Sequence, residues 1–186
     1  MSSSKASETF GQAIQDAENL LAHFNKLNTQ PPPAENEVLK RAGLIMAMTA
    51  WETFVEDRLQ EFAAVRLAGL SDSSIGTFVQ AKLDDEIKRL HNPTSEKSLQ
   101  LFRDFAGVDL AEHWAWNNYP PKLVRERLNQ YMKLRGDVVH RSRTVQTGQS
   151  QAHPVKKEDL ERVISFLKEL VKATERGLYA TLTCHS

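Results

Sequence analysis

The longest apolar run in the chain is Ala42-Gly-Leu-Ile-Met-Ala-Met-Thr-Ala-Trp51, which only Thr49 interrupts. Ten residues are too few to span a bilayer, so the run favours a buried helix over a membrane segment. From Leu44 to Phe54 apolar residues occur nearly all round the helix, which is typical of an element at the centre of a bundle. The rest of the chain is expected to pack around this helix.

Prolines and glycines divide the rest of the chain into further helices. Pro33, Asn92-Pro93 and Pro120-Pro121 mark helix starts or breaks, and Gly69 and Gly107 are expected stops. Within the segments, apolar residues recur three and four positions apart, and no segment alternates with a period of two. The expected helices cover residues 4–28, 33–68, 75–91, 94–106, 121–143 and 156–182.

Two stretches lack this periodicity. Val108 to Tyr119 holds two tryptophans, a tyrosine and His113, and is expected to be an irregular cover. Its aromatic residues favour core packing over a platform for stacking RNA bases. Thr144 to Val155 is polar and is expected to be a loop. The sequence therefore predicts an all-α fold, an antiparallel bundle of about six helices that forms a single domain over residues 1–186.

The composition excludes several classes of protein. Of the 186 residues, 40% are hydrophobic and 26% are charged, which is ordinary for a soluble globular domain, and the 24 basic and 24 acidic residues balance. The single cysteine, Cys184, cannot form an internal disulfide, and the first residues lack the apolar core of a signal peptide. We therefore expect a cytoplasmic protein that does not associate with membranes. No phosphate loop or metal-ligand spacing is present, so no metal or cofactor is expected.

A basic segment stands out in this neutral chain. Between Lys122 and Arg143 there are seven basic and two acidic residues, a local formal charge of +5. Such a patch suits a phosphate backbone. It also suits a solvated helix face that is balanced by acids of a neighbouring helix, and the charge alone leaves both interpretations open. The acids considered for that balance are Glu52, Glu56, Asp57 and Glu61.

Within this segment lies Tyr131-Met-Lys-Leu-Arg-Gly-Asp-Val-Val-His-Arg-Ser-Arg143. Gly136 would cost the helix roughly 1 kcal/mol relative to alanine, which indicates a close helix–helix crossing or a bend. Arg135 and His140 are five residues apart, which corresponds to roughly 140° of rotation and about 7.5 Å of rise on a helix. One helix would hardly direct both side chains at one phosphate. Two copies packed about a twofold axis could bring both pairs into a shared cleft.

The two residue types suit cleavage of RNA. A histidine titrates near neutrality and can take a proton from a ribose 2′-hydroxyl. An arginine keeps its charge and can hold a phosphate oxygen while negative charge builds up. Neither role needs a metal.

The motif Arg135-Gly-Asp-Val-Val-His140 resembles the Arg-x(4–6)-His hallmark of the HEPN superfamily of all-α ribonucleases. The segment Ala50-Trp-Glu-Thr-Phe-Val-Glu-Asp57 resembles the Trp-Glu-aromatic segment of its RiboL-PSP-HEPN branch. The resemblance implies a homodimer that cleaves RNA without a metal and leaves 2′,3′-cyclic phosphate and 5′-hydroxyl ends. Arg135 and His140 would be the catalytic pair. It also implies a role as a toxin or in defence against phage, with an antitoxin or defence-system protein as a partner.

Five further residues are candidates for supporting roles. Asp137 could supply the polar group that many relatives place directly after the arginine, or could only pair with Arg141. Glu52 could orient Arg135 or His140, or could simply form the polar edge of its helix. The residues expected to bind RNA are Lys133, Arg141 and Arg143.

Two other functions compete with the nuclease. One is a non-catalytic HEPN-like dimer that binds RNA or a protein. The other is a plain interaction bundle, in which His140 is a core residue and Arg135 pairs with Glu52.

Overall fold

The computed structural model of the chain describes residues 4–27, 33–70, 72–141 and 155–183. Within these ranges the chain forms six α-helices and no strand, which confirms the predicted all-α class. None of these helices is long and apolar enough to cross a membrane. The helices are α1 (Lys5–Leu27), α2 (Glu37–Leu67), α3 (Ser74–Lys88), α4 (Ser95–Leu101), α5 (Pro121–Arg141) and α6 (Lys157–Thr183). A 3-10 turn, Ala34–Asn36, precedes α2, and a π-helical turn, Phe102–Ala106, follows α4.

Most helix boundaries follow the local signals of the sequence. Thr94 caps α4, because its side chain accepts a hydrogen bond from the backbone N–H of Lys97 (3.3 Å). The π-helical turn ends at Gly107, whose φ of 67° suits glycine. Gly69 has no positive φ, so α2 does not end in the left-handed glycine cap that the sequence suggested. Instead, α2 ends one residue earlier than expected and the right-handed Ala68 leads into a turn.

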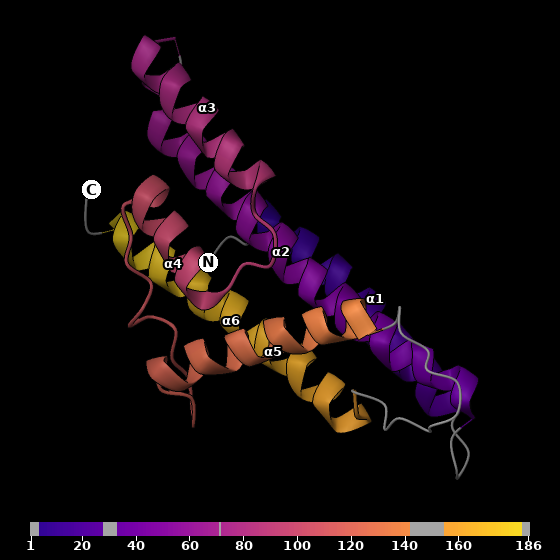
Figure 1. Cartoon of the computed structure of the whole chain (residues 1–186). Coiled ribbons are helices and arrows are strands. Elements are labelled where there is room, and N and C mark those ends of the chain that lie inside the picture. Colours follow the sequence, from indigo (N-terminus) through magenta and orange to yellow (C-terminus); the bar gives the residue numbers. More distant parts are fainter. Residues whose placement is uncertain (1–3, 28–32, 71, 142–154, 184–186) are drawn as a thin grey trace.

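The long helix α2 lies at the centre of the bundle. It forms an antiparallel pair with α1, and α6 packs against both of them (Figure 1). Trp51 of α2 is fully buried, with its ring centroid 5.7 Å from that of Phe54 and 5.9 Å from that of Trp114. The central position of this helix is thus confirmed. Its burial is not complete on all sides, because Met46 and Thr49 are exposed.

The irregular segment after Gly107 covers the bundle with aromatic side chains, as predicted. Trp114 is fully buried and donates its indole N–H to the hydroxyl of Thr174 on α6 (3.0 Å). Trp116 and Tyr119 stack on each other and pack against Phe166 of α6. These contacts agree with the expected role of the rings in packing, although Trp116 and Tyr119 are only partly buried.

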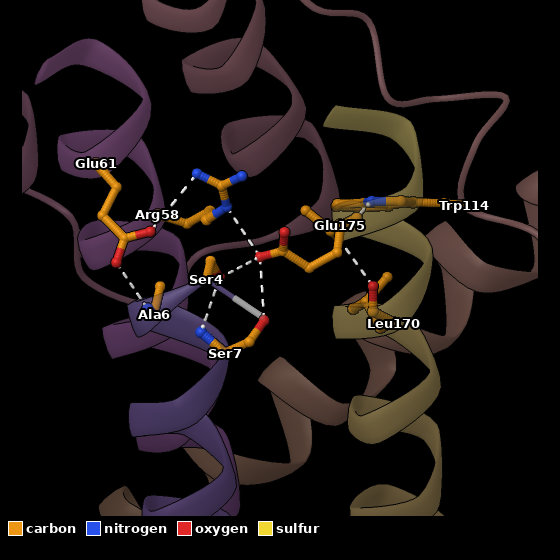
Figure 2. Close-up of polar contacts among 9 residues, drawn as sticks. Ser4, Ala6, Ser7, Arg58, Glu61, Trp114, Leu170 and Glu175 are labelled. Carbon is orange, nitrogen blue, oxygen red and sulfur yellow. Dashed lines mark hydrogen bonds and ion pairs between the residues drawn. The ribbon is translucent and has the colours of Figure 1, made fainter. Parts of the chain in front are cut away.

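A polar network fixes the start of α1 to α2 and α6 (Figure 2). Glu175 of α6 accepts hydrogen bonds from the hydroxyls of Ser4 and Ser7 and from Nε of Arg58, at 2.7 to 3.1 Å. Glu61 of α2 accepts a hydrogen bond from the backbone N–H of Ala6 (2.8 Å). Two carboxylates therefore meet the N-terminal end of α1, where the helix dipole favours negative charge.

The outer helix α3 packs mainly against α2. In the expected helix 75–91, the apolar residues are Phe78, Leu83, Ile87 and Leu90. Leu83 and Leu90 are buried and Ile87 packs against the core, but Phe78 is 62% exposed. Gly76 is also buried and lies close to the backbone of Leu70. Leu70 belongs to the turn between α2 and α3, so the small glycine lets this turn pack closely against the first turn of α3.

Candidate functional site

The C-terminal half of α5 meets the middle of α2 at Arg135. Its Nη2 lies 3.5 Å from Oε2 of Glu52, and its Nη1 donates a hydrogen bond to Oδ1 of Asn92. The Arg135 and Glu52 side chains are 20% and 15% exposed, respectively. The guanidinium is therefore partly buried, with one charged and one neutral acceptor beside it. This is the best-defined arrangement in the basic segment.

Asn92 lies in the turn between α3 and α4, and its backbone has a φ of 56°. Asparagine is one of the few residues besides glycine that adopts this left-handed region readily. The next residue, Pro93, is buried, and its carbonyl accepts hydrogen bonds from Nε1 of Trp51 (3.3 Å) and from Oγ of Ser98 (3.4 Å). The core tryptophan thus anchors the turn that presents Asn92.

A second set of polar contacts ties this turn to α5. The backbone N–H of Ser95 donates to Oδ1 of Asn129 (2.8 Å), and Nδ2 of Asn129 donates to both carboxylate oxygens of Glu96 (3.0 Å each). Burial raises the pKa of Glu96, but hydrogen bonds to its carboxylate, including those from Ser95 and Asn129, outweigh that effect and leave the pKa below its ordinary value. Arg135 therefore contacts the turn between α3 and α4, and Asn129 of the same helix contacts the start of α4.

Negative charge gathers on the face of α2 that carries Glu52. Burial raises the pKa of Glu56, and the charges of Glu52 and Asp57 raise it further. Burial also raises the pKa of Asp57, against the opposing effect of Lys5. Among the described side chains, Glu52 is the acid of α2 that pairs with the basic segment, whereas Glu61 contacts Arg58 and the start of α1.

The acids of α2 therefore balance little of the charge on α5. Among the described side chains, Arg125, Arg127 and Lys133 form no ion pair, and Lys133 is exposed. Lys122 pairs only with Glu126 of its own helix (3.9 Å). Among the described residues of the basic segment, Arg135 is thus the one paired with an acid of α2.

The remaining predicted site residues are placed less completely. The backbones of His140 and Arg141 belong to the last turn of α5, but their side chains, and all of Arg143, lie outside the described part of the structure. Asp137 is partly buried on α5, and its expected pairing with Arg141 falls outside the described side chains. The predicted convergence of Arg135 and His140 therefore stays a prediction.

The helix α5 runs without interruption through Gly136. A Cβ atom built at this glycine would have no described atom within 4 Å, apart from its own helix and chain neighbours. The close crossing that the sequence suggested at this point is therefore not made by any described helix of the same chain.

The sequence alone does not identify Asn92 as a neighbour of Arg135. The pair Asn92-Pro93 predicts only a helix break, and the structure confirms that break. The contact between Asn92 and Arg135 joins residues 43 positions apart, so no local pattern signals it. The one available hint was chemical, since an asparagine at a sharp turn tolerates a positive φ and still carries an acceptor.

These features define an all-α helical domain in which a partly buried arginine of one helix is held by acceptors from two other segments. The chain matches the model of the RiboL-PSP-HEPN family over residues 12–180. The protein therefore belongs to the RiboL-PSP-HEPN family, as its motifs suggested. No curated protein and no solved structure matches the chain significantly.

Proposed function

We propose that the protein is a metal-independent endoribonuclease in which Arg135 and His140 act at a homodimer interface. Membership of the HEPN family is consistent with a ribonuclease. The observation that carries the proposal is the pairing of Arg135 with Glu52 and Asn92, which orients a partly exposed guanidinium on the helix turn that leads to His140. An arginine held in this way is prepared to bind a phosphate.

In the proposed reaction, a ribose 2′-hydroxyl of the RNA attacks the adjacent phosphate of the same strand. His140 removes the proton of a ribose 2′-hydroxyl, and the 2′-oxygen forms a bond to the adjacent phosphorus. The bond from phosphorus to the 5′-oxygen breaks, and that oxygen takes a proton from a protonated histidine, for which the second copy of His140 is available. Arg135 stabilises the charge on the non-bridging phosphate oxygens. The products are a 2′,3′-cyclic phosphate and a 5′-hydroxyl.

A second copy of the chain would complete this site. Five positions on a regular helix separate Arg135 and His140 by roughly 140° of rotation, and no described atom beyond the chain neighbours and the helix backbone lies within 4 Å of a Cβ atom built at Gly136. A twofold packing of α5 against its copy would use that space and place four catalytic side chains in one cleft. The exposed Lys133, together with Arg141 and Arg143, would hold the RNA backbone beside it.

Within the auxiliary pair, Glu52 has the stronger support. It contacts Arg135 and would orient it, whereas Asp137 is proposed only from its position next to Gly136. The biological role proposed is that of a toxin or a phage-defence nuclease in the cytoplasm, controlled by an antitoxin or another protein of the same system. It rests on the resemblance of the motif to that superfamily.

The alternative is a non-catalytic dimer that binds RNA or a protein. One observation favours it: the charge of Arg135 is already partly neutralised by Glu52 within the same chain. In a purely structural pairing, Arg135 would stabilise the contact of α5 with α2 and would not meet a phosphate.

The deciding experiment is incubation of the purified protein with total cellular RNA in EDTA, beside the variants His140→Ala and Arg135→Ala. The proposal expects cleavage by the wild type, with cyclic-phosphate ends, and a loss of at least about 100-fold in each variant. His23→Ala and Arg103→Ala are matched controls, because both residues are exposed and lie outside α5.

Three outcomes are distinct. Retained RNA binding by a folded dimer without cleavage would favour the non-catalytic alternative. Equal cleavage by the wild type and both motif variants would mean that another site or a contaminant acts. Loss of cleavage in the control variants would show that the assay responds to altered stability and not to the motif.

A further inference from the structure

Two asparagines, Asn92 and Asn118, are the non-glycine residues with a positive φ in the described part of the chain (56° and 64°). Asn118 lies in a tight turn whose flanking residues, Trp116 and Tyr119, exchange two backbone hydrogen bonds (3.1 and 2.9 Å). That turn needs no side-chain contact from Asn118 to explain its conformation. Asn92 differs, because its side-chain oxygen is directed at Arg135.

We propose that Asn92 is a positioning residue that holds the guanidinium of Arg135 for its phosphate. This inference rests on the proposed nuclease function and extends it to a segment outside the Arg-His motif. Nη1 of Arg135 donates a hydrogen bond to Asn92, and Nη2 of Arg135 lies near Glu52. Two acceptors from different segments therefore fix the plane of the guanidinium. A single acceptor would leave that plane free to turn about the remaining contact.

The neutral amide suits this task better than a second carboxylate. An amide oxygen accepts a hydrogen bond without adding negative charge. Glu52 already supplies one negative charge beside Arg135, and another would offset the cation that must attract a phosphate. Asn92 therefore orients the side chain while leaving its positive charge in place.

The support for Asn92 is itself rigid. Trp51 is fully buried and donates its indole N–H to the carbonyl of Pro93, the residue after Asn92. Trp51 also directly precedes Glu52 in α2. The two acceptors of Arg135 are thus fixed to the same core residue, one through the backbone and one through a hydrogen bond. Preorganisation of this kind holds a functional side chain near its working geometry before the ligand arrives.

The test compares Asn92→Gly with Asn118→Gly. Both changes remove an asparagine side chain at a positive φ, and glycine adopts that φ without strain. We expect Asn92→Gly to lower the rate of RNA cleavage about 10- to 100-fold, with a smaller effect on KM, because a small misplacement of a catalytic group is costly. The apparent pKa of the pH profile should not move, since the histidine is unchanged. Asn118→Gly should behave as the wild type.

A second readout does not depend on cleavage. Modification of Arg135 by phenylglyoxal, followed by peptide mass analysis, reports how freely its guanidinium is reached. We expect Arg135 to react several-fold faster in Asn92→Gly than in the wild type. Asn92→Asp, which keeps an oxygen acceptor, should restore the slow reaction, and circular dichroism should show that all variants are folded.

The outcomes separate this inference from the proposed function. Equal labelling of Arg135 in the wild type and Asn92→Gly overturns the positioning role, whether or not the protein cleaves RNA. If Arg135 is labelled faster in Asn92→Gly but the rate of RNA cleavage is unchanged, Asn92 is not important for the reaction. If the wild type does not cleave RNA, but Arg135 is labelled faster in Asn92→Gly than in the wild type, the proposed nuclease function is overturned. Asn92 then remains a structural partner of Arg135.

Discussion

Glu56 lies one helical turn after Glu52 and is the acid for which a pH effect is best defined. Burial, and then the charges of Glu52 and Asp57, raise its pKa above the ordinary value of 4.5. The folded state therefore binds more protons than the unfolded state between pH 4.5 and the raised pKa, and stability is lost as the pH rises through that window. We expect Glu56→Gln to raise Tm at pH 7, where the charge is unfavourable, and to have no such effect well below pH 4.5.

Thermal unfolding followed by circular dichroism at both pH values checks this prediction. Glu112→Gln serves as the control, because Glu112 is exposed in the cover segment. A gain in Tm of the same size at acidic and neutral pH would mean that packing of the glutamine, and not removal of the charge, causes the effect.

Single residues show which parts of the candidate site could be predicted from the sequence and which could not. Arg135 and Glu52 were selected from patterns that lie in their own helices, and the structure places them in contact. Asn92 could not be selected, because its importance depends on a turn that three-dimensional packing brings beside α5. His140 was selected by its motif, but a motif does not determine the direction of a side chain, and its predicted role still depends on the RNA experiment.

At the level of the elements, the packing of the first turn of α3 against the turn that follows α2 depends on Gly76. A Cβ atom at this position would lie 2.0 Å from the backbone oxygen of Leu70, which cannot move away easily. We expect Gly76→Ala to lower the free energy of unfolding by about 1–3 kcal/mol, the usual cost of overpacking. Urea denaturation measures this loss, and hydrogen exchange should show that the amides of α3 lose protection first.

Gly11→Ala is the matched control for that change. Gly11 lies inside α1, and a Cβ atom there would have no described atom within 4 Å beyond its own helix and chain neighbours. Alanine should therefore stabilise the protein by up to about 1 kcal/mol through helix propensity. If both variants shifted stability in the same direction, the close approach of Gly76 to Leu70 would not explain the result.

Helix positions were largely predictable because their signals are local. Prolines, the cap residue Thr94 and the left-handed Gly107 each act on the backbone within a few residues. The face that a helix buries was less predictable, as the 62% exposure of Phe78 shows. Apolar spacing identifies a stripe, but whether another element covers that stripe depends on the arrangement of the whole chain.

For the whole molecule, the all-α bundle followed from the absence of strand patterns and from the apolar run at the centre of α2. The assembly of two chains was predicted from the motif alone, because the contacts within a single chain do not include those of a dimer interface. Gly136 is relevant both to the stability of the single chain and to the assembly of two chains. It costs helix stability, yet no described atom of another element approaches it closely enough to require a glycine.

Gly136→Ala therefore separates the single chain from the dimer. Within one chain, we expect alanine to leave the free energy of unfolding unchanged or to raise it by up to about 1 kcal/mol. In the proposed dimer, the added methyl group would separate the two copies of α5 where they cross, so the dissociation constant should rise at least about 10-fold, which corresponds to roughly 1.4 kcal/mol. RNA cleavage should fall with it, because the shared cleft needs residues from both chains.

Sedimentation measures the dissociation constant, and cleavage at several protein concentrations measures the coupling of activity to assembly. Gly11→Ala carries the same chemical change in α1 and should leave both quantities as in the wild type, while it stabilises the fold. High protein concentration should partly restore cleavage by Gly136→Ala, since mass action favours the dimer. If Gly136→Ala weakened cleavage without altering dimer formation, the space beside Gly136 would belong to the RNA and not to a second copy of α5.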